Sequence, residues 1–164
     1  MRLVVLLMGV SGSGKTTVGE LLASQMEWAF ADADDYHSAA NVEKMRTGIP
    51  LTDSDRAPWL ESLRVLIQGW IASGENGVLA CSALKRAYRD RLVVGPDVRV
   101  VYLEADQALL RQRLLGRQGH YMRESMLESQ IETLEEPDDA LVVDAGGTAE
   151  DIVAEIRSRL GSRL

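Results

Sequence analysis

Cysteine is almost absent from the 164 residues, because Cys81 is the one thiol in the chain. No intrachain disulfide can therefore form, and the composition fits a reducing compartment, for which we expect the cytoplasm. The chain also lacks an apolar run of about 18 residues, so we expect no transmembrane helix. Its apolar beginning has no small-residue cleavage site, and we interpret it as a strand and not as a signal peptide.

Positive charge is also in short supply, since the net charge is −7 and the isoelectric point is about 4.9. This balance argues against a general nucleic-acid or membrane-surface binder, and an anionic substrate would need a local basic cluster. Repeats, low-complexity segments and Pro/Gly-rich linkers are missing too. With 46% hydrophobic and 26% charged residues, we expect a single domain over residues 1–164.

One motif dominates what is present. Residues 9–16 fit the phosphate-binding pattern G-x-x-x-x-G-K-[ST], between an apolar strand-like run at 3–8 and a helical pattern at 17–26. The backbone N–H groups of such a loop bind phosphates, Lys15 reaches the β- and γ-phosphates, and the Thr16 hydroxyl binds Mg²⁺. An ordinary Gly/Ser turn is the alternative, which this context disfavours. The predicted ATP-binding residues here are Gly9, Val10, Ser11, Gly12, Ser13, Gly14, Lys15, Thr16 and Thr17.

Strand and helix patterns alternate along the chain. Further strands are predicted at 28–31, 78–81, 98–103 and 141–143. Helices are predicted at 38–47, from a Thr52/Asp55 capping box to about 71, and at 82–94, 106–115, 124–135 and 148–160. This order predicts an α/β P-loop fold: a parallel five-stranded sheet with helices on both faces, whose ligands bind at the carboxyl ends of the strands.

Three carboxylates follow the second predicted strand. In a kinase, one could take a proton from an attacking hydroxyl and another could help to hold Mg²⁺. We expect an extended segment, in which Asp32 and Asp34 alternate and so point the same way, whereas Asp35 points elsewhere. A solvated acidic turn is the alternative. His37 could equally make a structural hydrogen bond or contact the substrate.

Basic residues could supply the missing local positive charge. Arg56 could grip a substrate carboxylate with two hydrogen bonds or could pair with a neighbouring aspartate. Of the basic residues Lys85, Arg86 and Arg89, one or two could face the cleft while the others stay solvated. Arginines around the irregular stretch at 116–122 could neutralise transition-state charge from a mobile lid, or could serve solubility. These are Arg111, Arg113, Arg117 and Arg123.

Several motifs, in this order, resemble those of the gluconokinase family of P-loop small-molecule kinases. They are GVSGSGKTT, DADDYH, NVEKM followed by GIPLTDSDRAPWL, CSALKRAYRD, RLLGRQGHYM and ESQIETLEEP, which together cover most of residues 9–137. The resemblance implies an adenylate-kinase-like fold with a lid at about 116–123, and often a homodimer. It also implies Mg²⁺- and ATP-dependent phosphorylation of D-gluconate to 6-phosphogluconate. Tyr121 replaces the usual Phe of the lid motif, and Val93 replaces a basic residue.

The resemblance also implies roles for single residues. Lys15, Asp34 and Arg117 are the expected catalytic residues, with Asp34 as the group that orients or deprotonates the acceptor hydroxyl. Thr16 and Asp32 would hold the metal, and Arg113 and Arg117 would bind the ATP phosphates from the lid. The expected substrate-binding residues are Asp34, His37, Arg56, Lys85 and Arg89.

Three other functions compete with this interpretation. A shikimate-kinase-like enzyme also pairs a P-loop with Asp-x-Asp, but Cys-Ser-Ala-Leu stands where that family has a glycine-rich substrate loop. A GTP-binding switch would need the guanine-reading Asn-Lys-x-Asp, which the sequence lacks. A non-catalytic nucleotide-binding regulator is disfavoured by the intact Lys15, Thr16 and Asp34.

Overall fold

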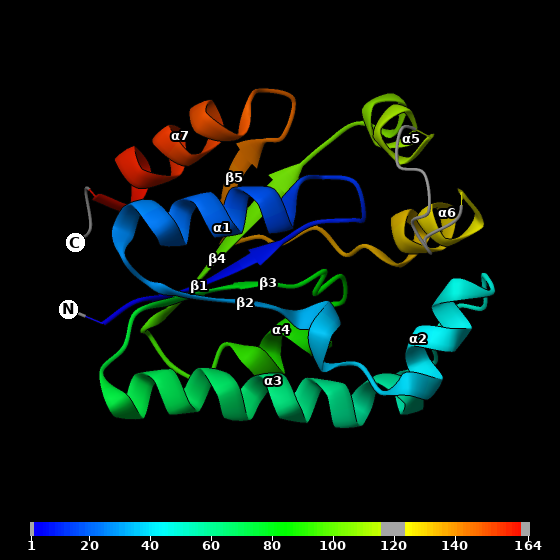
Figure 1. Cartoon of the computed structure of the whole chain (residues 1–164), viewed down its shortest axis with the longest axis horizontal. Helices are drawn as coiled ribbons and strands as arrows, with labels where there is room; N and C mark the ends of the chain where they lie inside the picture. The colour runs from blue at the N-terminus through cyan, green and yellow to red at the C-terminus, as the bar shows by residue number, and fades with distance from the viewer. Residues whose placement is uncertain (1, 116–123, 162–164) are drawn as a thin grey trace.

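A five-stranded parallel sheet forms the centre of the computed structural model, which describes residues 2–115 and 124–161 (Figure 1). Its strands are β1 (Val4–Met8), β2 (Ala29–Asp32), β3 (Gly77–Ala80), β4 (Val98–Glu104) and β5 (Leu141–Asp144). They lie in the order β2-β3-β1-β4-β5, and each neighbouring pair is parallel. The predicted α/β fold with this sheet is confirmed.

Helices cover both faces of the sheet, as predicted. The helical elements are α1 (Lys15–Met26), η1 (Ala33–Tyr36), α2 (Ala39–Arg46), α3 (Asp53–Ser73), α4 (Arg86–Leu92), α5 (Gln107–Leu115), α6 (Glu124–Thr133) and α7 (Ala149–Gly161). In Figure 1, α1 and α7 lie on one face and α3 and α4 on the other, while α2, α5 and α6 lie beyond the carboxyl ends of the strands. Among the described residues, no helix is long and apolar enough to cross a membrane.

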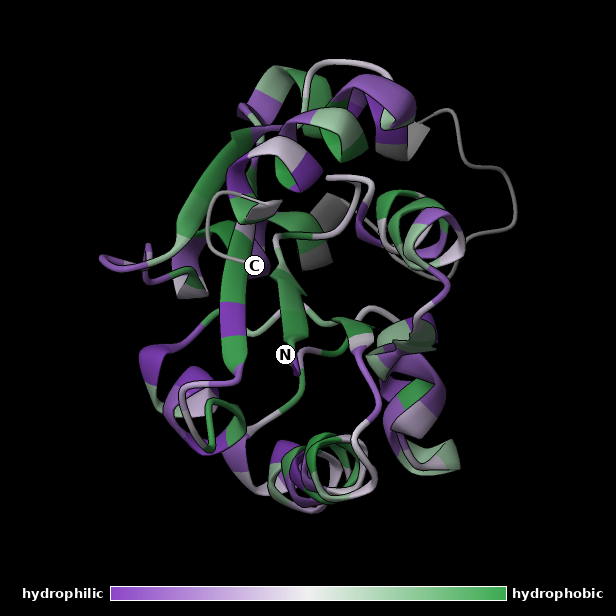
Figure 2. Ribbon diagram, turned by 90° about the vertical axis from the view of Figure 1, so that its left-hand side faces the viewer, coloured by the Kyte–Doolittle hydropathy of each residue, from purple (hydrophilic) through white to green (hydrophobic). Residues whose placement is uncertain are grey.

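The apolar run of β1 explains its central position. Val5 and Leu7 pack into the core cluster shared with α1 and α7, whereas Val4 and Leu6 pack into the cluster shared with α3 and α4. Successive strand side chains point to opposite faces, so a strand covered on both faces must be apolar throughout. Figure 2 shows the resulting hydrophobic strands between helices of mixed polarity.

Cap signals in the sequence position α3 beside the site. The Thr52 hydroxyl accepts a hydrogen bond from the Asp55 amide at 3.1 Å, and the Asp55 carboxylate accepts one from the Thr52 amide at 2.9 Å. This is the predicted capping box. The helix ends at Gly74, whose φ of +80° favours glycine.

The helix predicted at 82–94 is shorter than expected. It begins at Arg86, because residues 82–85 form a loop in which Ala83 has a φ of +45°. A left-handed residue cannot continue a right-handed helix. The loop carries Leu84 into a third apolar cluster with Val10 and Leu127. This cluster packs the P-loop against α6 and so shapes the end of the sheet where ligands are expected.

Candidate active site

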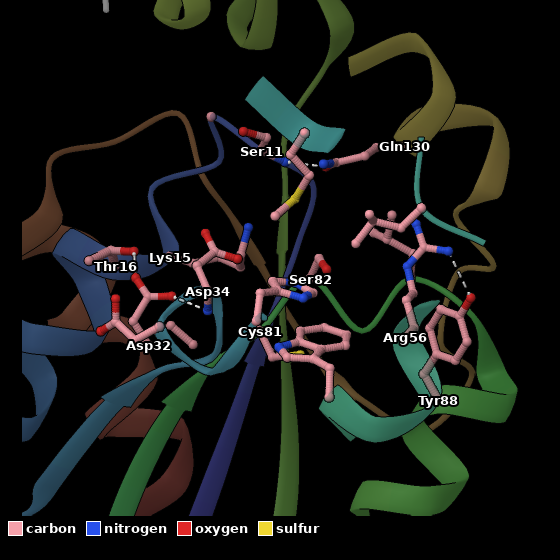
Figure 3. Close-up of a pocket in the computed structure, with 18 of the residues that line it drawn as sticks. Ser11, Lys15, Thr16, Asp32, Asp34, Arg56, Cys81, Ser82, Tyr88 and Gln130 are labelled. Carbon is pink, nitrogen blue, oxygen red and sulfur yellow. Dashed lines mark hydrogen bonds between the residues drawn. The ribbon is translucent and has the colours of Figure 1, made fainter. Parts of the chain in front are cut away.

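A cavity of about 450 Å³ lies at the carboxyl ends of the strands. Figure 3 shows Lys15, Thr16 and Asp34 on one side of it and Arg56 and Tyr88 on the other. The cavity therefore has a phosphate-binding side and a second, cationic side. Its lining residues are Ser11, Gly12, Gly14, Lys15, Thr16, Thr17, Asp32, Asp34, Asp35, His37, Val42, Met45, Leu51, Arg56, Trp59, Ala80, Cys81, Ser82, Leu84, Tyr88, Ser129, Gln130 and Thr133.

Glycines give the loop between β1 and α1 its shape. Gly12 and Gly14 have φ values of +89° and +97°, a conformation that residues with a Cβ rarely adopt. A Cβ on Gly9 would lie 2.6 Å from Ser13 Oγ and 3.0 Å from Leu103 O. The loop thus closes tightly and leads into the N-terminus of α1, an arrangement that fits an anionic phosphate.

The predicted ATP-binding residues of the loop fall into two groups. Ser11, Gly12, Gly14, Lys15, Thr16 and Thr17 line the cavity. Gly9, Val10 and Ser13 lie behind it: Val10 packs in the apolar cluster, and Ser13 is fully buried. Their part is therefore to form the loop and not to line the ligand space. Lys15 Nζ donates to the Val10 carbonyl at 3.2 Å, which folds this side chain back over the loop.

The predicted metal ligands are in direct contact. Thr16 Oγ1 donates to Asp32 Oδ2 at 2.7 Å, which joins the start of α1 to the end of β2. Among residues 2–115 and 124–161, no group of three His, Cys, Asp or Glu side chains could hold a metal ion. A hydroxyl and a carboxylate beside a phosphate loop do fit Mg²⁺, which protein sites commonly hold through one or two carboxylates, waters and substrate phosphates.

The acidic segment after β2 differs from the extended chain that we predicted from the sequence. Residues 33–36 form η1, and Asp32 caps it by accepting a hydrogen bond from the Asp34 amide at 2.9 Å. This tight turn brings Asp35 to the cavity together with Asp32 and Asp34. The expectation that Asp35 points elsewhere is therefore wrong, because the turn does not alternate sides as a strand does.

His37 lines the cavity and is held by neighbours from two helices. Its ring stacks on Trp59, with centroids 4.2 Å apart and an interplanar angle of 12°. Its Nδ1 lies 3.3 Å from Asn41 Nδ2. Burial, and secondly the charge of Arg56, lower the pKa of His37 to about 4. The imidazole is therefore neutral at neutral pH, and its position permits both roles left open by the sequence.

A hydrogen-bonded cluster supports Arg56 at the cationic side of the cavity. Its guanidinium donates to Tyr88 Oη at 3.1 Å, and Tyr88 in turn donates to Asp53 Oδ1 at 2.5 Å. Lys85 also donates to Asp53 Oδ1, at 3.0 Å. Asp53 and Asp55 pair with Lys85 and Lys44, so the surface pair offered as an alternative for Arg56 is not observed. The bond from Tyr88, and then that from Lys85, hold the pKa of Asp53 below its usual range.

Two residues predicted to bind the substrate lie elsewhere. Lys85 pairs with Asp53 and does not line the cavity. Arg89 is 6% exposed and donates to the carbonyls of Ala83, Leu84 and Glu135 at 2.8, 3.0 and 2.7 Å. The prediction for Arg89 needs correction, because a guanidinium occupied with buried carbonyls serves the fold of this loop.

The predicted lid can be followed only at its beginning. Arg113 does not line the cavity, and it donates to the carbonyls of Gly12, Ser13 and Ala145 at 3.2, 3.1 and 2.7 Å. It therefore stabilises the P-loop through backbone carbonyls. We had expected it to bind the phosphates of ATP, which would lie in the cavity. Arg117 and the predicted lid at 116–123 lie outside the described residues.

Some cavity residues gave no signal in the sequence. Gln130 accepts a hydrogen bond from the Ser11 amide at 2.7 Å, which ties α6 to the P-loop. Tyr88 lies between the basic residues Arg86 and Arg89 of α4 but belongs to no catalytic pattern. Gln130 lies on the same face of α6 as Leu127, Ile131 and Leu134, where only its polarity sets it apart. Cys81 is buried, and burial raises the pKa of its thiol to about 12, so it forms no thiolate nucleophile.

The fold and the loop define a P-loop small-molecule kinase, which binds ATP. A family model described as an AAA domain matches residues 4–137. A probable gluconokinase from Xenopus tropicalis is 41% identical, over 99% of this chain and 95% of that protein. Given this match, the chain belongs to the gluconokinase family.

Two crystal structures show the same likeness in three dimensions. An unliganded sugar kinase from Janibacter sp. HTCC2649 has a TM-score of 0.91 and 41% identity, over 98% of this chain and 95% of that chain. A gluconokinase from Sinorhizobium meliloti 1021 has a TM-score of 0.83 and 37% identity, over 99% of both chains. The gluconokinase assignment thus agrees with whole-chain structural similarity.

Proposed function

We propose that this protein phosphorylates D-gluconate to 6-phospho-D-gluconate with ATP and Mg²⁺. The observation that carries the proposal is the placement of Arg56 across one cavity from Lys15 and Thr16. Gluconate carries its carboxylate and its C6 hydroxyl at opposite ends of a six-carbon chain. A carboxylate held by Arg56 would therefore direct the C6 hydroxyl toward the P-loop.

The P-loop side would hold the nucleotide. Backbone N–H groups of the loop would bind the phosphates, and Lys15 would neutralise charge on the β- and γ-phosphates. Thr16 and Asp32 would hold Mg²⁺. When bound, ATP supplies the phosphoryl group and Mg²⁺ neutralises the charge that develops as it leaves. Arg113 would keep the loop in shape, and Arg117 remains a candidate for neutralising charge from the lid.

Asp34 is our candidate for the general base. Its amide is fixed by Asp32, which itself contacts Thr16, so the Asp34 side chain enters the cavity beside the proposed metal ligands. Asp34 would accept the proton of the C6 hydroxyl. The hydroxyl oxygen then forms the bond to phosphorus as the bond to ADP breaks.

The cationic side would select a sugar acid. Arg56 offers a planar pair of N–H donors that matches a carboxylate. Tyr88 accepts a hydrogen bond from the Arg56 guanidinium and donates one to Asp53, so both contacts fix the position of the guanidinium. A neutral sugar such as glucose offers no carboxylate to the half-buried guanidinium of Arg56, so it would forgo these charge-assisted hydrogen bonds and bind less tightly.

A coupled ADP-release assay with Mg²⁺ tests the proposal against a panel of gluconate, other aldonates, shikimate, glucose and nucleoside monophosphates. We expect strong turnover with gluconate and little with glucose or shikimate. Turnover only with another acceptor would support the kinase activity but contradict gluconate as the substrate. Tight ATP binding without turnover on any acceptor would favour the non-catalytic regulator.

We also keep as proposals a homodimer and a cytoplasmic location, which derive from the family resemblance and from the single cysteine. Light scattering coupled to size-exclusion chromatography measures the first directly. A mass of twice the 18.0 kDa of one chain is expected. Fractionation of the cells that make the protein tests the second.

A further inference from the structure

The Asn41 side chain is a buried polar group beside the active site. Asn41 is 6% exposed, and its Nδ2 donates to the Asp55 carbonyl of α3 at 2.9 Å. The same nitrogen lies 3.3 Å from His37 Nδ1. The two amide hydrogens of Asn41 thus have one acceptor each, one on α3 and one on the imidazole.

The Asp55 carbonyl decides which way the Asn41 amide points. A backbone carbonyl can only accept, so the Asn41 atom facing it must be the NH₂ nitrogen. The flipped amide would place Oδ1 against the carbonyl oxygen and leave a buried donor unsatisfied. The second amide hydrogen then points at His37 Nδ1, which must accept. In a neutral imidazole whose Nδ1 accepts, the hydrogen is on Nε2.

The surroundings of the ring oppose every other state. An imidazolium would place an Nδ1–H against the N–H of Asn41 and a positive charge near Arg56. The Trp59 stack fixes the ring plane, and Trp59 is itself fixed by its bond to the Ala33 carbonyl at 2.7 Å. Trp59 and Asn41 together therefore leave the imidazole one orientation and one tautomer.

We propose that Asn41 is a positioning residue that holds His37 as the neutral Nε2–H tautomer, which donates a hydrogen bond to an oxygen of the sugar acid. This role rests on the proposed function. His37 lines the cavity, and within the described part of the chain its Nε2 has no hydrogen-bond acceptor, so the substrate can supply one. A sugar acid offers hydroxyl and carboxylate oxygens there, and a fixed donor favours it over a deoxygenated analogue.

Nuclear magnetic resonance tests the tautomer without any substrate. Long-range ¹H–¹⁵N spectra of the labelled full chain report protonation of each ring nitrogen, and a His37→Gln spectrum separates His37 from His120, the other histidine. At pH 7 we expect a protonated Nε2 and an unprotonated Nδ1. In Asn41→Asp the new carboxylate accepts from Nδ1–H, so Nδ1 should become protonated. A wild-type Nδ1–H or imidazolium, or an Asn41→Asp spectrum like that of wild type, would overturn the proposal.

A matched pair of His37 variants tests the donor in the reaction. The side-chain amide of Gln places an N–H near the position of Nε2, whereas that of Asn places it near Nδ1. We expect the KM for gluconate to be about tenfold higher in His37→Asn than in His37→Gln, the value of one hydrogen bond, with equal KM values for ATP. Asn41→Asp should raise the KM for gluconate to a similar extent.

Equal KM values for gluconate in the two His37 variants would overturn the donor role. This control also separates the inference from the function on which it rests. Wild-type protein that turns over no gluconate contradicts the proposed function, whereas turnover with indistinguishable variants contradicts the inference alone. The wild-type spectrum needs no substitution. It therefore identifies the tautomer of His37 even if a variant fails to fold.

Discussion

Asp34 and Asp35 are neighbours in one tight turn, and both side chains line the cavity. Only Asp34 has its amide fixed by Asp32 next to the Thr16 contact. We predict that Asp34→Asn lowers kcat for gluconate by about 10²–10⁴-fold, the usual value of a general base. Asp35→Asn is the matched control and should lose far less. A larger loss in Asp35→Asn than in Asp34→Asn would transfer the role of base to Asp35.

Arg56 is predicted to act through its planar geometry and not through its charge alone. Arg56→Lys keeps the charge but loses the second N–H donor and the bond to Tyr88. We expect the KM for gluconate to rise about 10–100-fold, equivalent to about 1.4–2.8 kcal/mol, while the KM for ATP stays within about twofold. Steady-state kinetics with each substrate varied in turn measures both constants.

The control for this substitution lies two turns further along the same helix. Arg64 pairs with Glu61, away from the cavity. Arg64→Lys should therefore leave both KM values at wild-type levels. If Arg56→Lys also behaves like wild type, the guanidinium does not hold the carboxylate.

The elements themselves were largely predictable, because each is specified by local signals. The apolar run of β1, the capping box at Thr52 and Asp55 and the glycine at 74 act within a few residues of where they stand. The same holds for the P-loop, whose residues are contiguous. The carboxyl-end rule then places residues after β1, β2 and β3 in one cavity without any knowledge of contacts.

The contacts between elements were not predictable in the same way. Arg89 and Arg56 both lie near the start of a helix. Only the tertiary structure shows that Arg89 is buried against backbone carbonyls, whereas Arg56 lines the cavity. Gln130 reaches Ser11 across 119 positions of the sequence. Asn41 is one polar residue among several in α2, and its role depends on a carbonyl of α3. Long-range partners of this kind leave no periodic or motif signal in one sequence.

Arg89 joins three segments: the loop before α4, α4 itself and the chain after α6. Arg89→Met keeps the apolar stem but removes the guanidinium donor from three carbonyl groups, of which that of Leu84 still accepts from the Glu135 amide at 2.8 Å. We predict a loss of about 2–4 kcal/mol in the free energy of unfolding. Urea denaturation followed by circular dichroism measures it.

Arg91 on the same helix provides the comparison, since within the described part of the chain it makes only an exposed ion pair with Glu61 at 3.3 Å. Arg91→Met should change the free energy of unfolding by less than about 1 kcal/mol. Equal losses in the two variants would contradict a bracing role for Arg89.

At the scale of the whole molecule, the half-buried imidazole of His37 makes stability depend on pH. Burial, with a smaller effect of Arg56, lowers its pKa from 6.5 to about 4 in the folded chain. Between these values the unfolded chain binds a proton that the folded chain does not, so the free energy of unfolding falls as the pH drops. Asp55 does not share this window, because its bonds to the Thr52 amide and to Lys44 hold its pKa at about 2.

We therefore predict that wild-type protein loses about 1–2 kcal/mol more stability than His37→Gln between pH 7 and pH 4.5, a figure reduced for the partial exposure of the ring. Urea denaturation of both proteins at matched ionic strength measures the two losses. Carboxylates other than those near His37 titrate alike in both, so their contribution cancels in the difference. Parallel stability curves for the two proteins would show that the folded chain accommodates a charged His37, and the tautomer proposed for it would then lose its energetic basis.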